Sequence, residues 1–460
     1  MTAKTSRSWR GALATSRRLR NALVAVLVLA TLYGAYRYTL HRMVEAKLDQ
    51  IRKQGYPVTL AELDKWYPQP PPGENAADVY LAAFAKSNTW NTNVLMEKRD
   101  SLPIIGNAKL PRRSLPLPDE TKGLAERYLA DNAESIQLLR EAASFRKCQY
   151  PLGLTNGFEV SLPHLNSVRQ GARLLTLETV LQAEKGGSRA PSDSILDSAC
   201  LAHSLDREPL LISQLVRMAC QRIALTGLER VINRVSVTDN DLSRHIAWVS
   251  EAEASDGVIR GLTGELCLGN SLYAASGTQF SALVEGGYLW WSFKWKRGFI
   301  LAPSMALYRV TGLLDVDYLN FLNVLSDYIN AWRQPLPSRL GGEELFTNRI
   351  RDLPRWQLLS RTLLPSLSRA LIRDATHRAC LRAADAALSV ERYRLADGAL
   401  PNSLDALVPK FLDAVPTDPF DGQPLRYKKL AKGYVVYSVG EDGKDDGGDE
   451  KKDIAFTVER

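Results

Sequence analysis

Residues 365–398 read "PSLSRALIRDATHRACLRAADAALSVERYRLADG". Alanine, leucine and arginine dominate this stretch, and all three are strong helix formers. Gly398 stands directly after it, where a glycine commonly ends a helix in the left-handed conformation. We therefore predict one long helix over residues 365–396 that stops at Gly398.

Two strand-like segments follow this helix toward the C-terminus. "GYVVYSVG" spans 433–440 and "DIAFTVE" spans 453–459, and both are rich in β-branched and aromatic residues. The turn-rich connector "VPTDPFDGQPLRY", residues 415–427, precedes them. A long helix followed by a small antiparallel sheet predicts an α+β module over residues 365–460.

The loop between the two segments is acidic and rich in glycine. From Glu441 to Asp453 it holds seven carboxylates and three lysines, a local charge of −4. Ca²⁺ takes roughly six to eight oxygen ligands, and Gly443, Gly447 and Gly448 would let the backbone turn its carbonyls inward. The spacing alone is compatible with both a solvated acidic hairpin and a cation site.

The order of these features resembles the periplasmic domain of the major pseudopilin of type II secretion systems. In that family a Y-R-x-x-x-G-x-x-P segment ends the long helix, a D-P turn follows, and an S-x-G-x-D-G...G-G...D-I loop closes the sheet. The matching residues are "YRLADGALP", "DP" and "SVGEDGKDDGGDEKKDI", and the match covers roughly 385–455. It does not extend to the apolar N-terminal segment, so it implies the fold of the module and no assembly into a pseudopilus.

The resemblance also implies a structural calcium ion in the acidic loop. Asp442 and Asp453 stand on the D-G and D-I positions of the family's motif. Asp446 and Asp449 are further candidate ligands. The resemblance implies no catalytic residue and no organic cofactor.

Upstream of the module, the chain reads as a helical body over residues 76–335 and a linker over 336–364. Leu165, Val168, Ala172 and Leu175 recur at the spacing of one helix face. Thr238 is a candidate N-cap for a later helix. Strand signals are scarce, so we predict a mainly α-helical extracytoplasmic body.

The N-terminal region predicts a membrane anchor. "RRLRNALVAVLVLATLYGAYRYTL" covers 17–40 and carries no charge from Asn21 to Tyr36, which is about 24 Å of helix, and flanking arginines can lengthen it by snorkelling. No small-residue cleavage site follows the apolar run, which favours an uncleaved anchor over a signal peptide. We predict a basic cytoplasmic tail over 1–20, an anchor over 21–40, and a juxtamembrane helix with a proline-rich connector over 41–75. Thr59 and Glu62 form a capping-box pattern in that last segment.

Six lysines and arginines precede the span and five follow it closely, which favours a cytoplasmic N-terminus. We therefore expect a single-pass protein of the bacterial inner membrane, with its bulk in the periplasm.

The net charge of +8 has a local origin. Residues 1–53 carry eleven basic and two acidic side chains, or +9, which leaves −1 for the remaining residues. A nucleic-acid-binding protein needs its basic side chains on the folded surface, so this class is excluded.

The sequence contains none of the common hydrolase, nucleotide-binding or zinc-protease motifs. Asp374, His377 and Cys380 could begin a zinc site, but no fourth ligand is apparent and helix packing is the favoured interpretation. His203 with Asp206 and Glu208 reads as an ordinary helix end. The five cysteines form no C-x-x-C pair, which allows at most one disulfide.

Two other stretches resemble membrane contacts. "FILAPSMALY", 299–308, is too short to span and is interrupted by Pro303. "GGYLWWSFKWKRG", 286–298, could lie on a membrane surface, but packing of its aromatic side chains onto the helices is the favoured interpretation. Taken together, the sequence predicts a structural or interaction protein of the cell envelope that binds other envelope proteins. An envelope hydrolase with a site in the helical body and a component of a secretion system are the alternatives.

Overall fold

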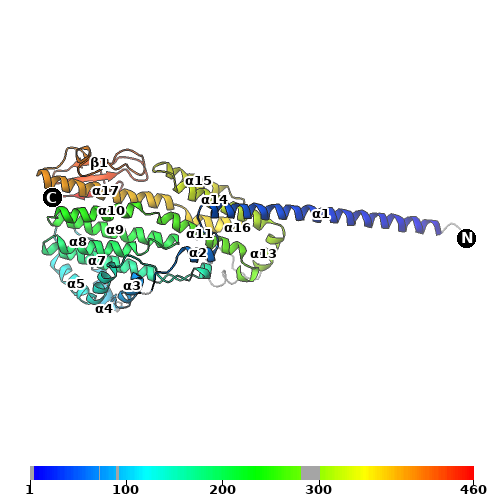
Figure 1. Ribbon diagram of the computed structural model, residues 1–460, viewed down its shortest axis with the longest axis horizontal. Helices are drawn as coiled ribbons and strands as arrows, with labels where there is room; N and C mark the ends of the chain where they lie inside the picture. Colours follow the sequence, from blue (N-terminus) through cyan, green and yellow to red (C-terminus); the bar gives the residue numbers. More distant parts are fainter. Residues whose placement is uncertain (1–4, 72, 90–92, 281–300) are drawn as a thin grey trace. The chain divides into compact units, whose positions relative to one another are not determined.

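The computed structural model describes residues 5–71, 73–89, 93–280 and 301–460 (Figure 1). The chain is mainly helical, with a long apolar N-terminal helix and a small antiparallel C-terminal sheet, as the sequence predicts. It divides into two compact units. Unit 1 comprises Met1–Tyr56, Leu272–Val324 and Leu353–Thr362, and unit 2 comprises Pro57–Ser271, Leu325–Asp352 and Leu363–Arg460.

Unit 1 is built around helix α1 (Thr5–Lys53). It also holds α13 (Leu301–Val310), most of α16 (Leu358–Leu363), the first half of α14 (Leu313–Trp332) and the end of α11 (Gly257–Ala274). Among the described residues, α1 is the one helix long and apolar enough to cross a membrane. Its large apolar side chains from Leu19 to Tyr38 are exposed, whereas Leu40, Val44, Leu48 and Ile51 are buried along one face.

Asp317 organises the interior of unit 1. Its buried carboxylate accepts hydrogen bonds from the hydroxyl of Tyr308 at 2.8 Å and from the backbone N–H groups of Leu359 at 2.9 Å and Ser360 at 3.2 Å. These bonds join α14 to the start of α16. A buried carboxylate is tolerated when donors surround it in this way.

Unit 2 is a layered array of helices. It contains most of α11 and the second half of α14. Its complete helices are α2 (Leu60–Trp66), α3 (Ala76–Ala85), α4 (Asn93–Asp100), α5 (Asp119–Ala130), α6 (Ala133–Ala143), α7 (His164–Lys185), α8 (Arg189–His203), α9 (Leu211–Arg234), α10 (Asp239–Ala254), α15 (Gly341–Asp352) and α17 (Ala370–Asp397). Short 3-10 turns stand at Leu154–Glu159, Ser338–Leu340, Leu364–Leu367 and Leu404–Leu407. Helix α7 packs on both α8 and α9, and α10 lies along α17 (Figure 1).

The structure confirms the buried face of α7 and the two helix caps that the sequence predicts. The face of α7 formed by Leu165, Val168, Ala172 and Leu175 is buried, as the spacing predicts. Thr238 caps α10 by accepting from the Asp241 N–H at 3.2 Å. Thr59 likewise caps α2 through the Glu62 N–H, while the Glu62 side chain reaches back to the Val58 N–H, one residue before the cap.

The C-terminal module contains α17 and a three-stranded antiparallel sheet in the order β1-β2-β3. The strands are β1 (Arg426–Lys429), β2 (Tyr434–Ser438) and β3 (Ile454–Val458), with Val436 opposite both Tyr427 and Phe456. The hydroxyl of Tyr434 donates to the Ala387 carbonyl at 2.9 Å and ties the central strand to α17.

Two details of the module differ from the prediction. The helix begins at Ala370 rather than 365, because Pro365 stands in a 3-10 turn and Arg369 is left-handed with φ +67°. Strand β1 lies in the segment that the sequence indicates as a connector. The helix end is as predicted, since Gly398 has φ +76° and donates to the Arg394 carbonyl.

Candidate functional site

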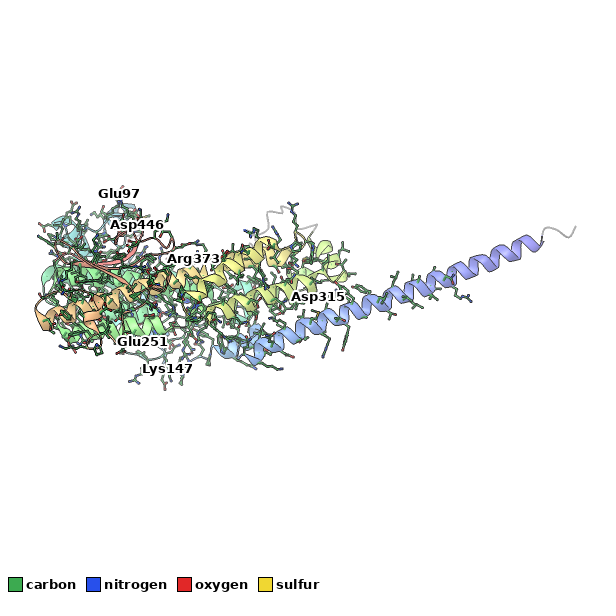
Figure 2. All side chains as sticks on the ribbon, turned by 90° about the horizontal axis from the view of Figure 1, so that it is seen from above. Glu97, Lys147, Glu251, Asp315, Arg373 and Asp446 are labelled. Atoms are coloured by element: carbon green, nitrogen blue, oxygen red, sulfur yellow. The ribbon has the colours of Figure 1, made fainter. Side chains whose placement is uncertain are left out.

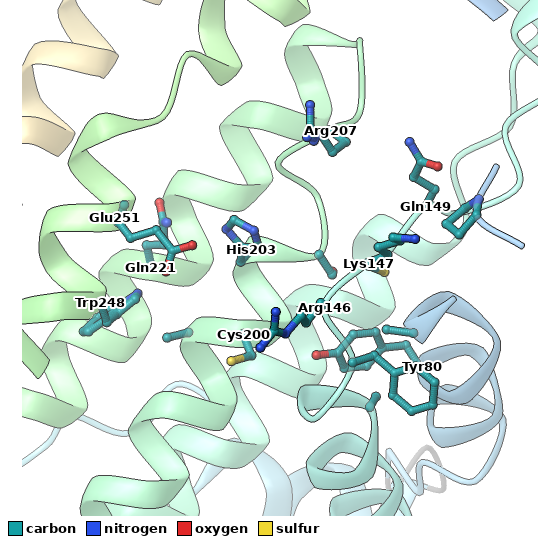
Figure 3. Close-up of a pocket in the computed structure, with 18 of the residues that line it drawn as sticks. Tyr80, Arg146, Lys147, Gln149, Cys200, His203, Arg207, Gln221, Trp248 and Glu251 are labelled. Atoms are coloured by element: carbon teal, nitrogen blue, oxygen red, sulfur yellow. The ribbon is translucent and has the colours of Figure 1, made fainter. Parts of the chain in front are cut away.

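Unit 2 contains a large open cavity among α3, α8, α10 and the segments that join the early helices (Figure 3). Its volume is about 1070 Å³, which is near the upper end for a site that takes a small organic molecule. All of its lining residues belong to unit 2.

Two helices present one face each to the cavity. Leu196, Ala199, Cys200 and His203 line it from α8, and Arg244, Ala247, Trp248 and Glu251 line it from α10. Both sets recur at helical spacing, so each is a single stripe of its helix. In Figure 3 His203 lies between Glu251 and Gln221 on one side and Lys147 on the other.

The opposite wall is extended backbone. Proline-rich residues 67–71 and the segment 145–149 form it. Asn75 holds the second segment in place, because its side-chain amide donates to the Gln149 carbonyl at 2.8 Å and accepts from the Gln149 N–H at 2.9 Å. A short bridge between Asn75 and Lys147 extends this pairing. The wall is therefore held in place by the hydrogen bonds of Asn75 to the 147–149 backbone and by the restricted backbone of the prolines.

The cavity lining is strongly basic. Its cationic side chains are Arg146, Lys147, Arg207, Arg244 and Arg260, against Glu251 as the one lining acid. Lys147 pairs with Glu74 at 2.8 Å and Arg244 with Asp193 at 2.8 Å. Within the part of the chain that the structure describes, Arg146 and Arg207 are exposed and have no acidic partner. Their charges are available to an anion in the cavity.

Two donor groups are buried in the cavity wall. The Tyr67 hydroxyl lies beside the Tyr150 backbone, and the Trp248 indole N–H has no hydrogen-bond partner among the described residues; the two residues are 4% and 8% exposed. Leaving a buried polar group unpaired costs about 1–3 kcal/mol. Burial, followed by the charge of Glu208, holds the pKa of Tyr67 well above its usual range, so its hydroxyl stays a donor. Both polar atoms are enclosed within the wall rather than open to the cavity.

A buried polar cluster lies behind Tyr67. His164 Nε2 and Glu208 Oε1 are 2.7 Å apart, and the His164 ring stacks on Tyr150 with centroids 4.4 Å apart. The Tyr150 hydroxyl in turn lies 3.1 Å from Ser204 Oγ. The residues of this cluster come from three separate segments, around Tyr150, around His164 and over residues 204–208, so no local motif marks it in the sequence.

The two cysteines of the cavity are poor nucleophiles. Burial raises the pKa of Cys148 to about 12 and that of Cys200 to about 11. The reactive form of cysteine is the thiolate, which these pKa values keep scarce near neutral pH. All five cysteines of the chain are free thiols. The arrangement supports binding of an anion and does not support thiol chemistry.

The two clusters of polar residues that the sequence analysis singled out do not form sites in the structure. His203 lines the cavity, but Glu208 pairs with His164 and Asp206 accepts from the Ser255 hydroxyl at 2.6 Å. At the other cluster, Asp374 pairs with Arg339 and Arg378, both at 2.9 Å. Both ring nitrogens of His377 are buried and have no partner among the residues that the structure describes, and burial beside Arg217 lowers its pKa. Asp374, His377 and Cys380 are therefore packing residues of α17.

The four predicted calcium ligands lie in the loop between β2 and β3, where Figure 2 labels Asp446. Asp453 is buried and accepts from the Gly448 N–H at 2.7 Å, and Asp446 pairs with Lys452 at 2.7 Å. Asp442 and Asp449 accept from backbone N–H groups two residues further on, those of Lys444 and Lys451. The described residues include no group of three or more acidic, histidine or cysteine side chains arranged around a metal position. Calcium binding by this loop stays a prediction.

Sequence reasoning missed most of the site. The basic pair Arg146 and Lys147 was a visible signal, but nothing in the sequence links it to Trp248 a hundred residues later. The predicted aromatic stretch over 286–298 lies outside the described residues.

Comparison with known proteins adds no relative. No family model matches the chain, no curated protein is significantly similar to it, and no solved structure matches its fold. The likeness of the C-terminal module to pseudopilins therefore remains a prediction from the sequence.

Proposed function

We propose that this chain is a membrane-anchored binding protein of the cell envelope whose helical body takes up an organic anion. The observation that carries the proposal is the cavity of unit 2, where two exposed arginines, Arg146 and Arg207, have no acidic partner among the described residues and stand beside aromatic and apolar surface. Arginine holds carboxylates and phosphates through charge-assisted bonds, and the aromatic and apolar residues of the lining offer surface to the rest of the ligand. The ligand class is an anion with an apolar or aromatic body.

The anchor supports the envelope location. α1 exposes an uninterrupted apolar surface from Leu23 to Leu32 with tyrosines at its end, as helices at a membrane interface do. The basic residues before the span favour a cytoplasmic tail and a periplasmic body. Protease added to right-side-out vesicles should digest the body; complete protection would contradict this orientation.

The binding proposal is tested with two matched probes, naphthalene-2-sulfonate and the neutral 2-naphthol. The readout is the unfolding temperature of the full chain in lipid nanodiscs, because a ligand that binds only the folded state raises it by mass action. We expect millimolar sulfonate to raise the midpoint by a few degrees and the neutral probe to have little effect.

The double variant Arg146→Ala/Arg207→Ala should lose most of this shift. Arg351→Ala is the matched control, because Arg351 is an exposed arginine of α15 outside the cavity. Equal shifts with the two probes, or an undiminished shift in the double variant, would show that the cavity does not select anions.

We further propose that the acidic loop binds one structural calcium ion. Asp442, Asp446, Asp449 and Asp453 would supply carboxylate oxygens, and the ion would offset their mutual repulsion. The support is the order of the loop relative to the helix end and the D-P turn.

A further inference from the structure

The corner between α13 and α14 rests on the end of the apolar stretch of α1. Gly312 stands at this corner with φ +78°, and a Cβ there would lie 3.0 Å from the Tyr36 ring and 3.2 Å from Cδ of Arg37. The corner thus contacts α1 closely, and all of these residues belong to unit 1.

Three polar contacts fix the corner at this level. The Tyr33 hydroxyl donates to the Val310 carbonyl, and Arg37 donates to the Arg309 carbonyl. Arg37 also pairs with Asp315 at 2.8 Å, near the start of α14 (Figure 2). The first charged residue after the span is therefore bound to the corner, and its charge is balanced by Asp315.

The outer surface of the corner is uncharged. Ala306, Leu307, Val310 and Thr311 are exposed, and Leu307 and Val310 are each 65% exposed. Arg309, the one charged side chain of α13, turns inward to the carbonyls of Tyr273 and Ala275 at the end of α11. Two large apolar side chains on an uncharged surface are unfavourable in water.

The level at which the corner contacts α1 indicates what surrounds Leu307 and Val310. Tyr33 lies inside the uncharged stretch, four residues and about 6 Å of helix before Arg37. Val310 is bonded at the level of Tyr33 and therefore beside the part of α1 that faces lipid if the helix spans a bilayer. Its exposed surface continues that of the anchor.

We propose that the α13–α14 corner is a second membrane contact, which inserts Leu307 and Val310 into the boundary between headgroups and acyl chains beside the anchor. The inference rests on the membrane anchoring put forward under Proposed function. Burying two such side chains contributes favourably in proportion to their area, and the Arg37–Asp315 pair would then fix unit 1 on the bilayer surface.

The test measures depth in the bilayer at single positions. An environment-sensitive fluorophore is attached to the full chain in nanodiscs through Leu307→Cys or Val310→Cys, with quenching by lipids brominated at a shallow or a deep carbon. The background carries Cys148→Ser, Cys200→Ser and Cys380→Ser, since Cys220 and Cys267 are buried, and its unfolding midpoint must match that of the natural chain. Val28→Cys in the span and Met43→Cys beyond it are the controls; both side chains are exposed.

We expect shallow quenching severalfold above the Met43 level at positions 307 and 310, and deep quenching at position 28. Deep quenching at position 28 with positions 307 and 310 equal to position 43 would overturn the second contact and leave the anchor intact. Absence of quenching at position 28 would overturn the anchor, and with it the inference.

Discussion

Asp418 shows how a single carboxylate can be buried when donors surround it. It is the acid of the D-P turn, and it accepts from the Phe420 N–H at 3.0 Å, the Ser438 hydroxyl at 2.8 Å, the Val439 N–H at 2.9 Å and Arg426 at 2.7 Å. Each of its oxygens has two donors. Such a carboxylate replaces its lost water with protein donors, which explains why an aspartate is needed where the turn meets β2.

Glu265 is the opposite case and carries a pH prediction. The Leu211 N–H at 3.2 Å is its one hydrogen-bond donor among the described residues, and burial raises its pKa from 4.5 to about 7. The folded chain therefore keeps this proton across a window in which the unfolded chain loses it. The contribution of Glu265 to stability is present at low pH and is lost as the pH rises from about 4.5 to 7.

We expect the stability of Glu265→Gln to match that of the natural chain at pH 4 and to exceed it at pH 8, by at most about 3 kcal/mol. The glutamine keeps an acceptor for Leu211 and has no charge to bury. Unfolding midpoints across this pH range give the measurement, with the exposed Glu344→Gln as control. A constant difference between Glu265→Gln and the natural chain would contradict the raised pKa.

At the scale of elements, α11 approaches the start of α9 through three glycines. A Cβ on Gly257 would meet Gln214 and Arg217, one on Gly261 would meet Leu211, and one on Gly264 would lie 1.5 Å from the Pro209 carbonyl oxygen. The three positions lie on one face of α11. Small residues at this spacing let two backbones come closer than side chains would allow.

Gly264→Ala should destabilise the chain by about 3 kcal/mol or more, because the obstructing atom belongs to the backbone and has no rotamer to adopt. Gly123→Ala is the control, since it lies in α5 with nothing within 4 Å and should stabilise by about 0.5–1 kcal/mol. Chemical denaturation of both variants measures the difference. Equal effects would show that α11 can move away from Pro209 at little cost.

The sequence predicted elements whose cause is local. Gly398 and Thr238 act on neighbouring backbone groups, and the face of Leu165 follows from helix geometry alone. Strand β1 was not predicted because it is an edge strand of sequence RYKK. Its lysines are exposed, and its pairing depends on β2. The cavity was not predicted either, because Tyr67, Arg146 and Trp248 are far apart in the sequence and come together only through tertiary packing.

At the scale of the whole molecule, the C-terminal module is joined to the helical body. The Thr457 N–H donates to Glu229 of α9 at 2.8 Å, and Asn233 of α9 donates to the Thr457 carbonyl at 2.9 Å. Arg113, between α4 and α5, bonds both Glu229 at 2.9 Å and Glu450 of the acidic loop at 2.6 Å. One compact unit therefore holds the loop, the sheet and the early helices, and stabilisation of the loop acts on all of them.

Calcium should for this reason change the stability of the entire chain. We expect millimolar calcium to raise the unfolding midpoint of the full chain in nanodiscs by several degrees relative to a chelator, because binding to the folded state alone shifts the equilibrium. Asp442→Asn and Asp453→Asn should each abolish most of this difference, whereas Asp119→Asn, on the exposed first turn of α5, should preserve it. An unfolding midpoint that is the same in calcium and in chelator would rule out the calcium site. Asp453 would then have only a structural role, because its carboxylate accepts a hydrogen bond from the Gly448 N–H and so holds the loop closed.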